Sequence, residues 1–152
     1  MPITTRAVAL AAALALLPLA ATACPDYMQN GQLLSYSSDE AWSPRAHAVI
    51  AGGPIDLAAC PMPGYGHVAQ APDFTLTFTD NDAGRALEFR VEGSCDTLML
   101  VNDASAGWHF NDDDIGLDPR IRIESAPEGV YDIWVGTFGP ETCSARFIVE
   151  TF

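Results

Sequence analysis

Apolar and polar residues alternate along several short segments of the second half of the chain. In residues 74–79, Phe74, Leu76 and Phe78 alternate with three threonines. A period of two residues is typical of a β-strand that turns one face to the core. The same pattern, or a short apolar run bounded by turn residues, occurs six more times. The seven predicted strands are residues 74–79, 86–92, 97–101, 108–110, 120–124, 130–137 and 144–151.

Short strands at this spacing, separated by turns rich in Gly, Pro, Asn and Asp, predict an all-β protein, an antiparallel β-sandwich. The segment 24–72 is less regular, with short predicted strands at 32–37 and 47–50 and a proline- and glycine-rich loop at 60–66. A segment this short has too few core positions to fold alone. We therefore expect a single domain over residues 24–152, in which 24–72 is an irregular part attached to a core of residues 73–152.

Residues 1–23 have the features of a cleavable secretory signal peptide. Arg6 is followed by an apolar run that ends in Ala21-Thr22-Ala23, a pattern that a signal peptidase accepts. The run is shorter than the roughly 20 residues that cross a bilayer, so no membrane span is expected. We predict an exported protein, periplasmic or extracellular, that begins at Cys24. The alternative is a lipoprotein signal with a lipid on Cys24, although Ala21 stands where such signals usually carry Leu.

Four cysteines remain after the predicted cleavage site. An even number of cysteines in an exported protein indicates disulfides. Three pairings are open, and we favour Cys24–Cys60 with Cys95–Cys143 because each pair brackets a distinct segment. Each bridge would stabilise the fold by roughly 3–5 kcal/mol through loop closure.

Acidic residues greatly outnumber basic ones, 20 against 7, for a net charge of −13. This charge repels phosphates and excludes nucleic acid as a partner. The densest acidic stretch runs from Asn111 to Asp118 and contains Gly116, which permits a tight turn. Carboxylates on a loop are typical Ca²⁺ ligands, although the spacing is not that of an EF-hand. The alternative is a solvated acidic hairpin loop. The candidate Ca²⁺ ligands are Asp112, Asp113, Asp114 and Asp118, with Asn102 and Asp103 as the nearest residues that could complete the site.

Four stretches, residues 95–103, 107–113, 117–121 and 129–137, resemble the bacterial pre-peptidase C-terminal domain, above all its small stand-alone exported forms. The resemblance covers residues 74–152 and rests on the Gly-x-Tyr-x-aliphatic-x-Val pattern that starts at Gly129 and on the Asp-Asp…Asp-Pro loop. It implies a jelly-roll-like β-sandwich without catalytic residues. Some members bind Ca²⁺ through acidic loop residues, and others bind polymers such as collagen. These domains usually lie beside a secreted peptidase, and no peptidase is attached to this chain.

No recognisable catalytic motif is present: the sequence has no Gly-x-Ser-x-Gly elbow, no His-Glu-x-x-His and no phosphate-binding loop. We expect His109 to be a half-exposed strand residue and His47 and His67 to lie at the surface. Among the aromatic residues, Trp108, Trp134, Tyr131 and Phe138 are predicted to be core or half-core, and Trp42, Tyr36 and Tyr65 are candidates for a stacking face.

The sequence therefore predicts an exported, non-catalytic binding module, with Ca²⁺ in the acidic loop as its only candidate cofactor and an unknown protein or polymer ligand as its partner. One alternative is a partner or modulator of a separate secreted peptidase that acts in trans. Another is a small hydrolase. The sequence makes no prediction of the oligomeric state.

Overall fold

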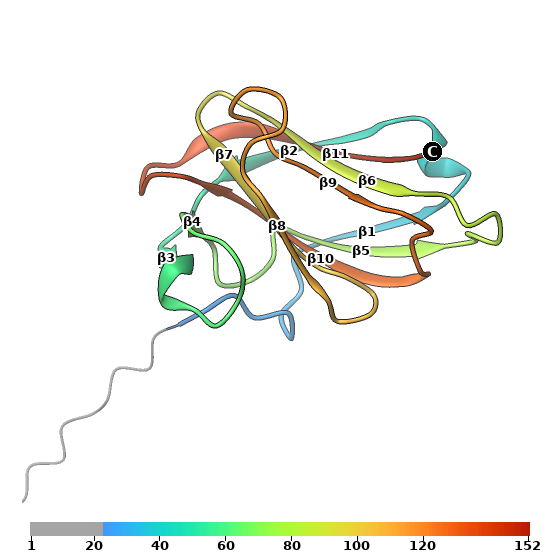
Figure 1. Ribbon diagram of the computed structural model, residues 1–152, viewed down its shortest axis with the longest axis horizontal. Helices are drawn as coiled ribbons and strands as arrows, with labels where there is room; N and C mark the ends of the chain where they lie inside the picture. The colour runs from blue at the N-terminus through green and yellow to red at the C-terminus, as the bar shows by residue number, and fades with distance from the viewer. Residues whose placement is uncertain (1–22) are drawn as a thin grey trace, which may run out of the picture.

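The alternating segments form two β-sheets that pack face to face, as the ribbon of the computed structural model shows (Figure 1). The structure describes residues 23–152, so the predicted signal peptide lies outside the described residues except for Ala23. The predicted β-sandwich is confirmed. No helix in the described part of the chain is long and apolar enough to cross a membrane.

One sheet is antiparallel throughout, in the order β2-β11-β6-β9. Its central strands β6 and β11 alternate inward apolar residues with outward polar ones, as the sequence predicts. The strands of this antiparallel sheet are β2 (Arg45–Ala51), β6 (Leu87–Gly93), β9 (Arg120–Ile123) and β11 (Cys143–Thr151).

The second sheet is mixed, because β1 and β5 run parallel while its other pairs are antiparallel. The parallel pair departs from the predicted antiparallel arrangement. It arises because the chain crosses to the other sheet after β1 and forms β2 there before it returns to β5. The strands of the mixed sheet are β1 (Gln32–Ser37), β3 (Ile55–Asp56), β4 (His67–Val68), β5 (Phe74–Thr79), β7 (Thr97–Asn102), β8 (Trp108–Asn111) and β10 (Gly129–Thr137).

The main core lies between the two sheets and is built by the apolar residues of every alternating strand. Aromatic rings cross this layer. Phe147 of β11 stacks on Phe74 of β5, with ring centroids 4.8 Å apart, and on Phe89 of β6 at 5.8 Å. Stacked and tilted aromatic pairs add to the free energy gained by burial, so this row of rings fixes the sheets against each other.

A second, smaller core lies on the outer face of the mixed sheet. Trp134 of β10 and two leucines of β7 point outward there and are fully buried. Residues 53–70, which we call the covering segment, lie over them and contribute Leu57 and Val68. The Trp134 indole donates a hydrogen bond to the Gln70 carbonyl oxygen at 3.3 Å. Strand β7 is thus buried on both faces, which explains its continuous apolar run.

The irregular first part of the chain contains the strands predicted at 32–37 and 47–50, as β1 and the centre of β2. It also contains two 3₁₀-helices, η1 (Glu40–Trp42) and η2 (Leu57–Ala59). These helices and the two-residue strands β3 and β4 are too short to produce a periodic pattern in the sequence.

Two disulfides tie the chain, with the pairing that the sequence favours. Cys24–Cys60 attaches the start of the described chain to the covering segment, and its Cα atoms lie 5.7 Å apart. Cys95–Cys143 joins the β6–β7 connection to the start of β11, with a Cα separation of 6.2 Å. The Cys24 sulfur forms a disulfide in this structure, and a sulfur atom in a disulfide cannot also carry the thioether of a lipid.

Candidate functional site

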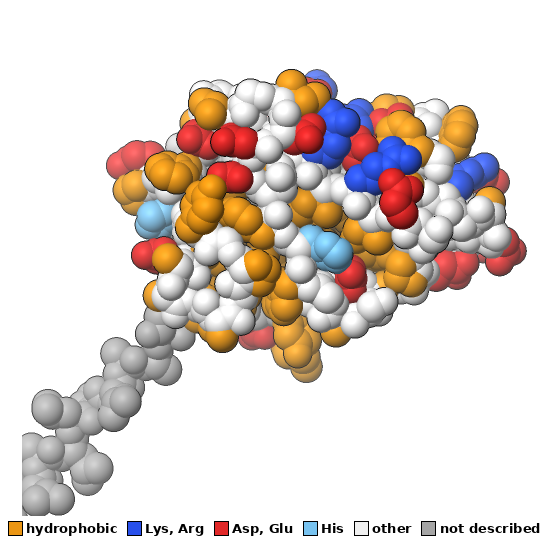
Figure 2. Space-filling model, in the orientation of Figure 1, with side chains coloured by type: hydrophobic (Ala, Val, Ile, Leu, Met, Phe, Trp, Pro, Cys, Tyr) orange, Lys and Arg blue, Asp and Glu red, His pale blue; other side chains and the backbone are white. Residues whose placement is uncertain are grey.

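Acidic and aromatic side chains meet at one end of the sandwich, where β7 begins and β8 and β10 end. They come from the covering segment, the β6–β7 connection, β8 and the loops that follow β8 and β10. Figure 2 shows acidic and apolar side chains side by side at this end of the molecule. We call this surface the acidic-aromatic patch and define it as Tyr65, Asp96, Phe110, Asp112, Asp113 and Phe138.

Tyr65 lies at the centre of the patch. Its ring packs against Phe110, with centroids 5.2 Å apart, and meets Phe138 edge-on at 5.8 Å. Its hydroxyl group donates a hydrogen bond to Asp112. Gly64 makes this position possible, because its φ of +109° suits glycine and a Cβ atom there would collide with the Phe110 ring. Tyr65 and Phe138 remain 42% and 57% exposed, so the patch presents aromatic surface to solvent.

Three carboxylates surround these rings without a compensating cation. Within residues 23–152, Asp96, Asp112 and Asp113 form no ion pair with an arginine or histidine. Partial burial, followed by the charges of Asp113 and Asp112, raises the pKa of Asp96. The hydrogen bond to Asp112, followed by burial and the same charges, raises the pKa of Tyr65. The patch is therefore a site of unbalanced negative charge.

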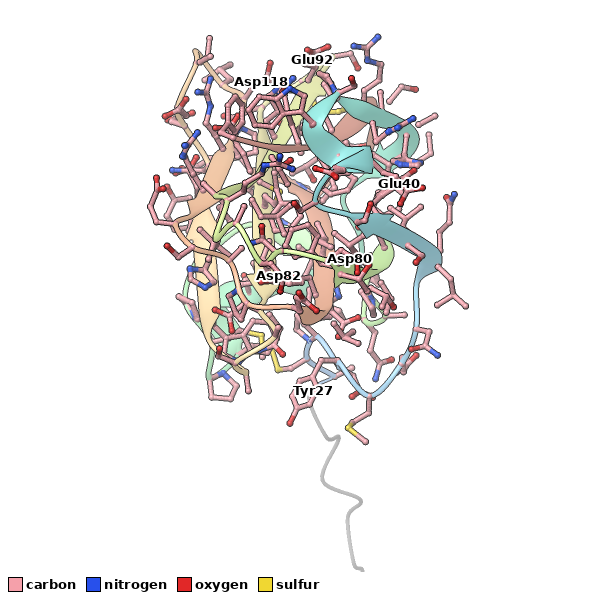
Figure 3. All side chains as sticks on the ribbon, turned by 90° about the vertical axis from the view of Figure 1, so that its right-hand side faces the viewer. Tyr27, Glu40, Asp80, Asp82, Glu92 and Asp118 are labelled. Atoms are coloured by element: carbon pink, nitrogen blue, oxygen red, sulfur yellow. A yellow bond between two sulfur atoms is a disulfide. The ribbon has the colours of Figure 1, made fainter. Side chains whose placement is uncertain are left out.

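The rest of the acidic loop is held by contacts within the protein. Asp114 pairs with the Arg120 guanidinium group, 3.1 Å from its Nε. Asp118 accepts hydrogen bonds from the Gly93 amide at 2.9 Å and from the Thr97 hydroxyl at 3.2 Å. An open groove of about 200 Å³ separates this part of the loop from β6, and Figure 3 shows Asp118 beside Glu92 of that strand. Asp114 and Asp118 anchor the loop, whereas Asp112 and Asp113 face solvent beside Tyr65.

The structure does not bring the six predicted Ca²⁺ ligands together. Asn102 and Asp103 lie at the β7–β8 turn, whereas Asp112 lies beyond the other end of β8. The four residues of β8 separate these groups by roughly 13 Å. The prediction that Asn102 and Asp103 complete the loop site is wrong for this reason. In the described part of the chain, no group of three or more His, Cys, Asp or Glu residues is arranged to hold a metal ion.

Asp103 instead closes the β7–β8 turn. Its Oδ1 accepts hydrogen bonds from the Ser105 and Gly107 amides, both at 2.8 Å, and its Oδ2 lies 2.6 Å from His109 Nε2. Burial raises the pKa of Asp103, but the hydrogen bonds from His109 and the two amides outweigh it and hold the pKa below its usual value. His109 is half-buried in β8, as predicted, and orients this carboxylate.

The prediction that His47 and His67 lie at the surface is wrong, since both are half-buried. His47 points from β2 into the edge of the core, where its ring packs on Phe74 and its Nε2 lies 3.1 Å from the Tyr36 hydroxyl oxygen. Burial lowers the pKa of His47. His67 lies in β4, and its Nδ1 is buried without a hydrogen-bond partner in the described structure. The strand that holds His47 was predicted, but the pattern does not show that His47 points inward; the two-residue strand of His67 is too short to produce a pattern.

The predicted roles of the aromatic residues are confirmed in part. Trp134 and Tyr131 are fully buried, but Phe138 is exposed because it follows the last residue of β10. The proposed stacking face of Trp42, Tyr36 and Tyr65 does not form, since Trp42 lies at the opposite end of the sandwich, beside Arg85. Sequence reasoning missed Asp96 and Phe138 as members of the patch. The favoured Cys95–Cys143 bridge could have indicated both residues, because it brings Asp96, next to Cys95, close to the loop that connects Phe138 to Cys143.

No family model matches this chain, and no curated protein sequence is similar to it. Among solved structures, the chain is similar to the crystal structure of Aeromonas hydrophila PliG, a periplasmic lysozyme inhibitor of g-type lysozyme. The identity is 12%, the TM-score is 0.42, and the match covers 80% of this chain and 99% of that chain. A likeness at this level assigns neither a family nor a ligand.

Proposed function

We propose that this chain is an exported, non-catalytic binding module that holds a protein partner on the acidic-aromatic patch. The observation that carries the proposal is the packing of the exposed Tyr65 between Phe110 and Phe138, with Asp112 at its hydroxyl group. Exposed aromatic residues in a fixed position are typical of the energetic centre of protein interfaces. The two disulfides agree with an oxidising, extracytoplasmic location.

The charge of the patch favours a basic partner. Asp96, Asp112 and Asp113 offer acceptors for Lys or Arg side chains, and the faces of Tyr65 and Phe138 offer cation–π contacts beside them. Burial is the main cause of the raised pKa of Asp96, and a cation seated there would relieve the second cause, the repulsion from Asp113 and Asp112. Complementary charge raises the rate of association as well as its specificity, and this effect decreases with salt.

The contacts of the His109–Asp103 pair make it a structural part of the β7–β8 turn. Both Asp103 oxygens are engaged in the β7–β8 turn and with His109. Within the described residues, no serine, threonine or cysteine side chain is hydrogen-bonded to His109. The pair therefore lacks the nucleophile of a triad. The resemblance to pre-peptidase C-terminal domains agrees with a binding role, since that family has no catalytic residues.

The binding proposal is tested with defined peptides and matched variants. An oligo-lysine peptide should bind the immobilised protein in a salt-dependent manner, and an oligo-glutamate peptide should not. Changing Asp96, Asp112 and Asp113 together to Asn should abolish this binding. The control changes Asp80 and Asp82 to Asn at the opposite end of β6, where Figure 3 shows both residues. Equal binding by the triple variant, or loss of binding in the control alone, would contradict the proposal.

Binding of Ca²⁺ by the acidic loop stays a prediction. Asp114 is paired with Arg120, and Asp118 accepts hydrogen bonds from Gly93 and Thr97, so an ion would have to bind chiefly through Asp112 and Asp113. Ca²⁺ at 100 times its dissociation constant stabilises a protein by about 2.7 kcal/mol. We expect a higher melting temperature in Ca²⁺ than in EDTA, and Asp113→Asn should remove the difference. A melting temperature that is the same in Ca²⁺ and in EDTA for both proteins would contradict Ca²⁺ binding by the loop.

A further inference from the structure

The aromatic surface of the acidic-aromatic patch continues along β8. Trp108 and Phe110 are alternate residues of this strand and lie on the face that packs against the smaller core. Tyr27 meets the Trp108 ring edge-on, with centroids 6.2 Å apart, and Phe110 packs against Tyr65. Tyr65 in turn meets Phe138. Five rings thus follow one another, and we call Tyr27, Trp108, Phe110, Tyr65 and Phe138 the aromatic row.

The rings of the row remain accessible to a partner. Tyr27 is 51% exposed, and Trp108 and Phe110 are half-buried. Figure 2 shows apolar side chains in a band across this face, which runs from acidic side chains toward the beginning of the described chain. Exposed apolar surface that is continuous over several side chains is typical of interaction sites.

The Tyr27 end of the row is held in place by the covering segment. The Cys24–Cys60 disulfide joins the two segments, and the Asp26 amide donates a hydrogen bond to the Gln70 carbonyl oxygen at 2.9 Å. A surface that is ordered before binding loses less conformational entropy when a partner binds. The row therefore offers a prepared surface along its length.

Negative charge is concentrated at one end of the row. The three carboxylates of the acidic-aromatic patch lie around Tyr65 and Phe138. The carboxylate next to Tyr27 belongs to Asp26, and its oxygens accept hydrogen bonds from the Met28 amide at 3.0 Å and from the Gln29 side chain at 3.1 Å. A partner with cationic and apolar side chains is therefore complementary to the row in one orientation.

We propose that the aromatic row binds an extended segment of a basic protein partner, with Lys or Arg at the acidic end and apolar side chains along the rings. This inference rests on the proposed function, because it describes what the acidic-aromatic patch holds. Alternate side chains of an extended chain lie about 6.6 Å apart on one face. Contacting rings of the row have centroids 5.2–6.2 Å apart, so each ring can receive one alternate side chain.

Calorimetric titration of the full mature protein with synthetic peptides tests the proposal. The alternating peptide has three lysines followed by three Ser-Leu pairs. The block peptide has the same residues with the leucines adjacent, and the serine peptide has six serines after the lysines; each is used in both chain directions. We expect the alternating peptide to bind about tenfold or more tightly than the serine peptide in one direction, because its leucines bury apolar surface on the rings. The block peptide should gain less, since adjacent side chains point to opposite faces.

Variants of Tyr27 separate this proposal from the proposed function. Tyr27→Ala should remove most of the gain of the alternating peptide and leave oligo-lysine binding unchanged, whereas Tyr27→Phe keeps the ring and should keep the gain. Trp42→Ala, at the other end of the sandwich, is the control for loss of an exposed aromatic residue. Equal affinity for the alternating and block peptides, or a full gain in Tyr27→Ala, overturns the extended segment while oligo-lysine binding still supports the proposed function. Failure of oligo-lysine to bind contradicts both.

A spin label on the alternating peptide tests its orientation. A nitroxide at the lysine end should broaden the amide NMR signals of Asp112 and Asp113. A nitroxide at the leucine end should broaden those of Tyr27 and Met28 instead. If both labels broaden the same signals, the peptide does not lie along the row and the proposal is wrong.

Discussion

Both ends of the sandwich carry aromatic and acidic side chains, but within residues 23–152 these side chains are paired with arginines at only one end. At the end that holds η1, Arg85 lies over the Trp42 ring at 4.8 Å and pairs with Asp39 at 2.5 Å, and Arg122 lies over Phe152 at 4.6 Å. At the other end, Tyr65 and Phe138 have no arginine over their rings among the described residues. The η1 end thus pairs its aromatic and acidic side chains with arginines of the protein itself, whereas the acidic-aromatic patch has none among the described residues.

The largest expected effect follows from removing the bridge beside the acidic-aromatic patch. Changing Cys95 and Cys143 together to Ser should cost about 4 kcal/mol of unfolding free energy, because the closed loop spans 48 residues. Asp96 adjoins one of these cysteines, so binding of oligo-lysine should weaken as well. Urea denaturation measures the first effect. An unchanged unfolding midpoint would show that the patch is held without the bridge.

The carboxyl group of Asp73, a partly buried residue that directly precedes β5, lies beside Val135 of β10 and should dominate the pH dependence of stability. Burial raises the pKa of Asp73 to about 7, partly offset by the hydrogen bond from the Val135 amide at 2.7 Å. Since the folded-state pKa lies above the unfolded value, stability should fall as the pH rises from about 4 to about 7 and then level off. The loss is at most about 4 kcal/mol.

Asp73→Asn should remove this loss, because an amide oxygen can still accept from Val135 and carries no charge. We expect the variant to be more stable than the wild type at pH 8 and nearly equal at pH 4, as measured by thermal unfolding. Asp82→Asn, which removes an exposed charge, serves as the control. A pH profile of Asp73→Asn that follows the wild type would contradict the assignment.

The difference in binding between the two ends is tested most directly at Tyr65. Tyr65→Ala removes the ring that packs on both phenylalanines and should cost about 2 kcal/mol in binding, roughly a thirtyfold loss of affinity. Trp42→Ala removes an exposed aromatic residue at the other end and should leave the affinity for oligo-lysine unchanged. Isothermal titration calorimetry distinguishes these outcomes. Similar losses in both variants would mean that the aromatic residues act through overall stability.

The smallest effect is a gain of binding. Arg85→Gln uncovers Trp42 and leaves Asp39 without its partner, so the η1 end should acquire a weak site for oligo-lysine. The cost in stability should be about 1–2 kcal/mol, since the lost contacts are one partly exposed ion pair, one cation–π contact and one hydrogen bond to the Ser38 hydroxyl. The peptide stoichiometry should rise from one to two sites. If the variant still binds one peptide, then pairing with arginine is not the reason why the η1 end does not bind oligo-lysine.

Most of the sandwich could be predicted because its strands alternate. Residues 74–79 and 32–37 coincide with β5 and β1, and the other predicted strands differ from the observed ones by a few residues at their ends. The parallel pairing of β1 with β5 could not be predicted, since a strand has the same pattern whichever way its neighbour runs. The covering segment was missed for another reason: its strands of two residues are too short for a period.

The candidate site was less accessible to sequence reasoning. Asp112 and Asp113 were found because they adjoin each other, and Tyr65 was noted only as a loop aromatic. Asp96 and Phe138 join the patch through tertiary contacts, in which the Phe138 amide donates to the Asp96 carbonyl oxygen at 3.1 Å. Asn102 and Asp103 were included wrongly because they are close in sequence, whereas the direction of β8 carries the loop away from them.

The pairing of β2 with β11 constrains when the protein can fold. Residues 45–51 find their neighbour in residues 143–151, the last strand of the chain. A fold dominated by such distant pairings forms slowly, because long loops must close before the contacts stabilise them. If the chain crosses a membrane from its N-terminus, both sides of β2 remain unpaired until the final residues emerge. During that interval the unpaired apolar strand can aggregate or be bound by chaperones. The rate of translocation then determines how long the chain is at risk of aggregation.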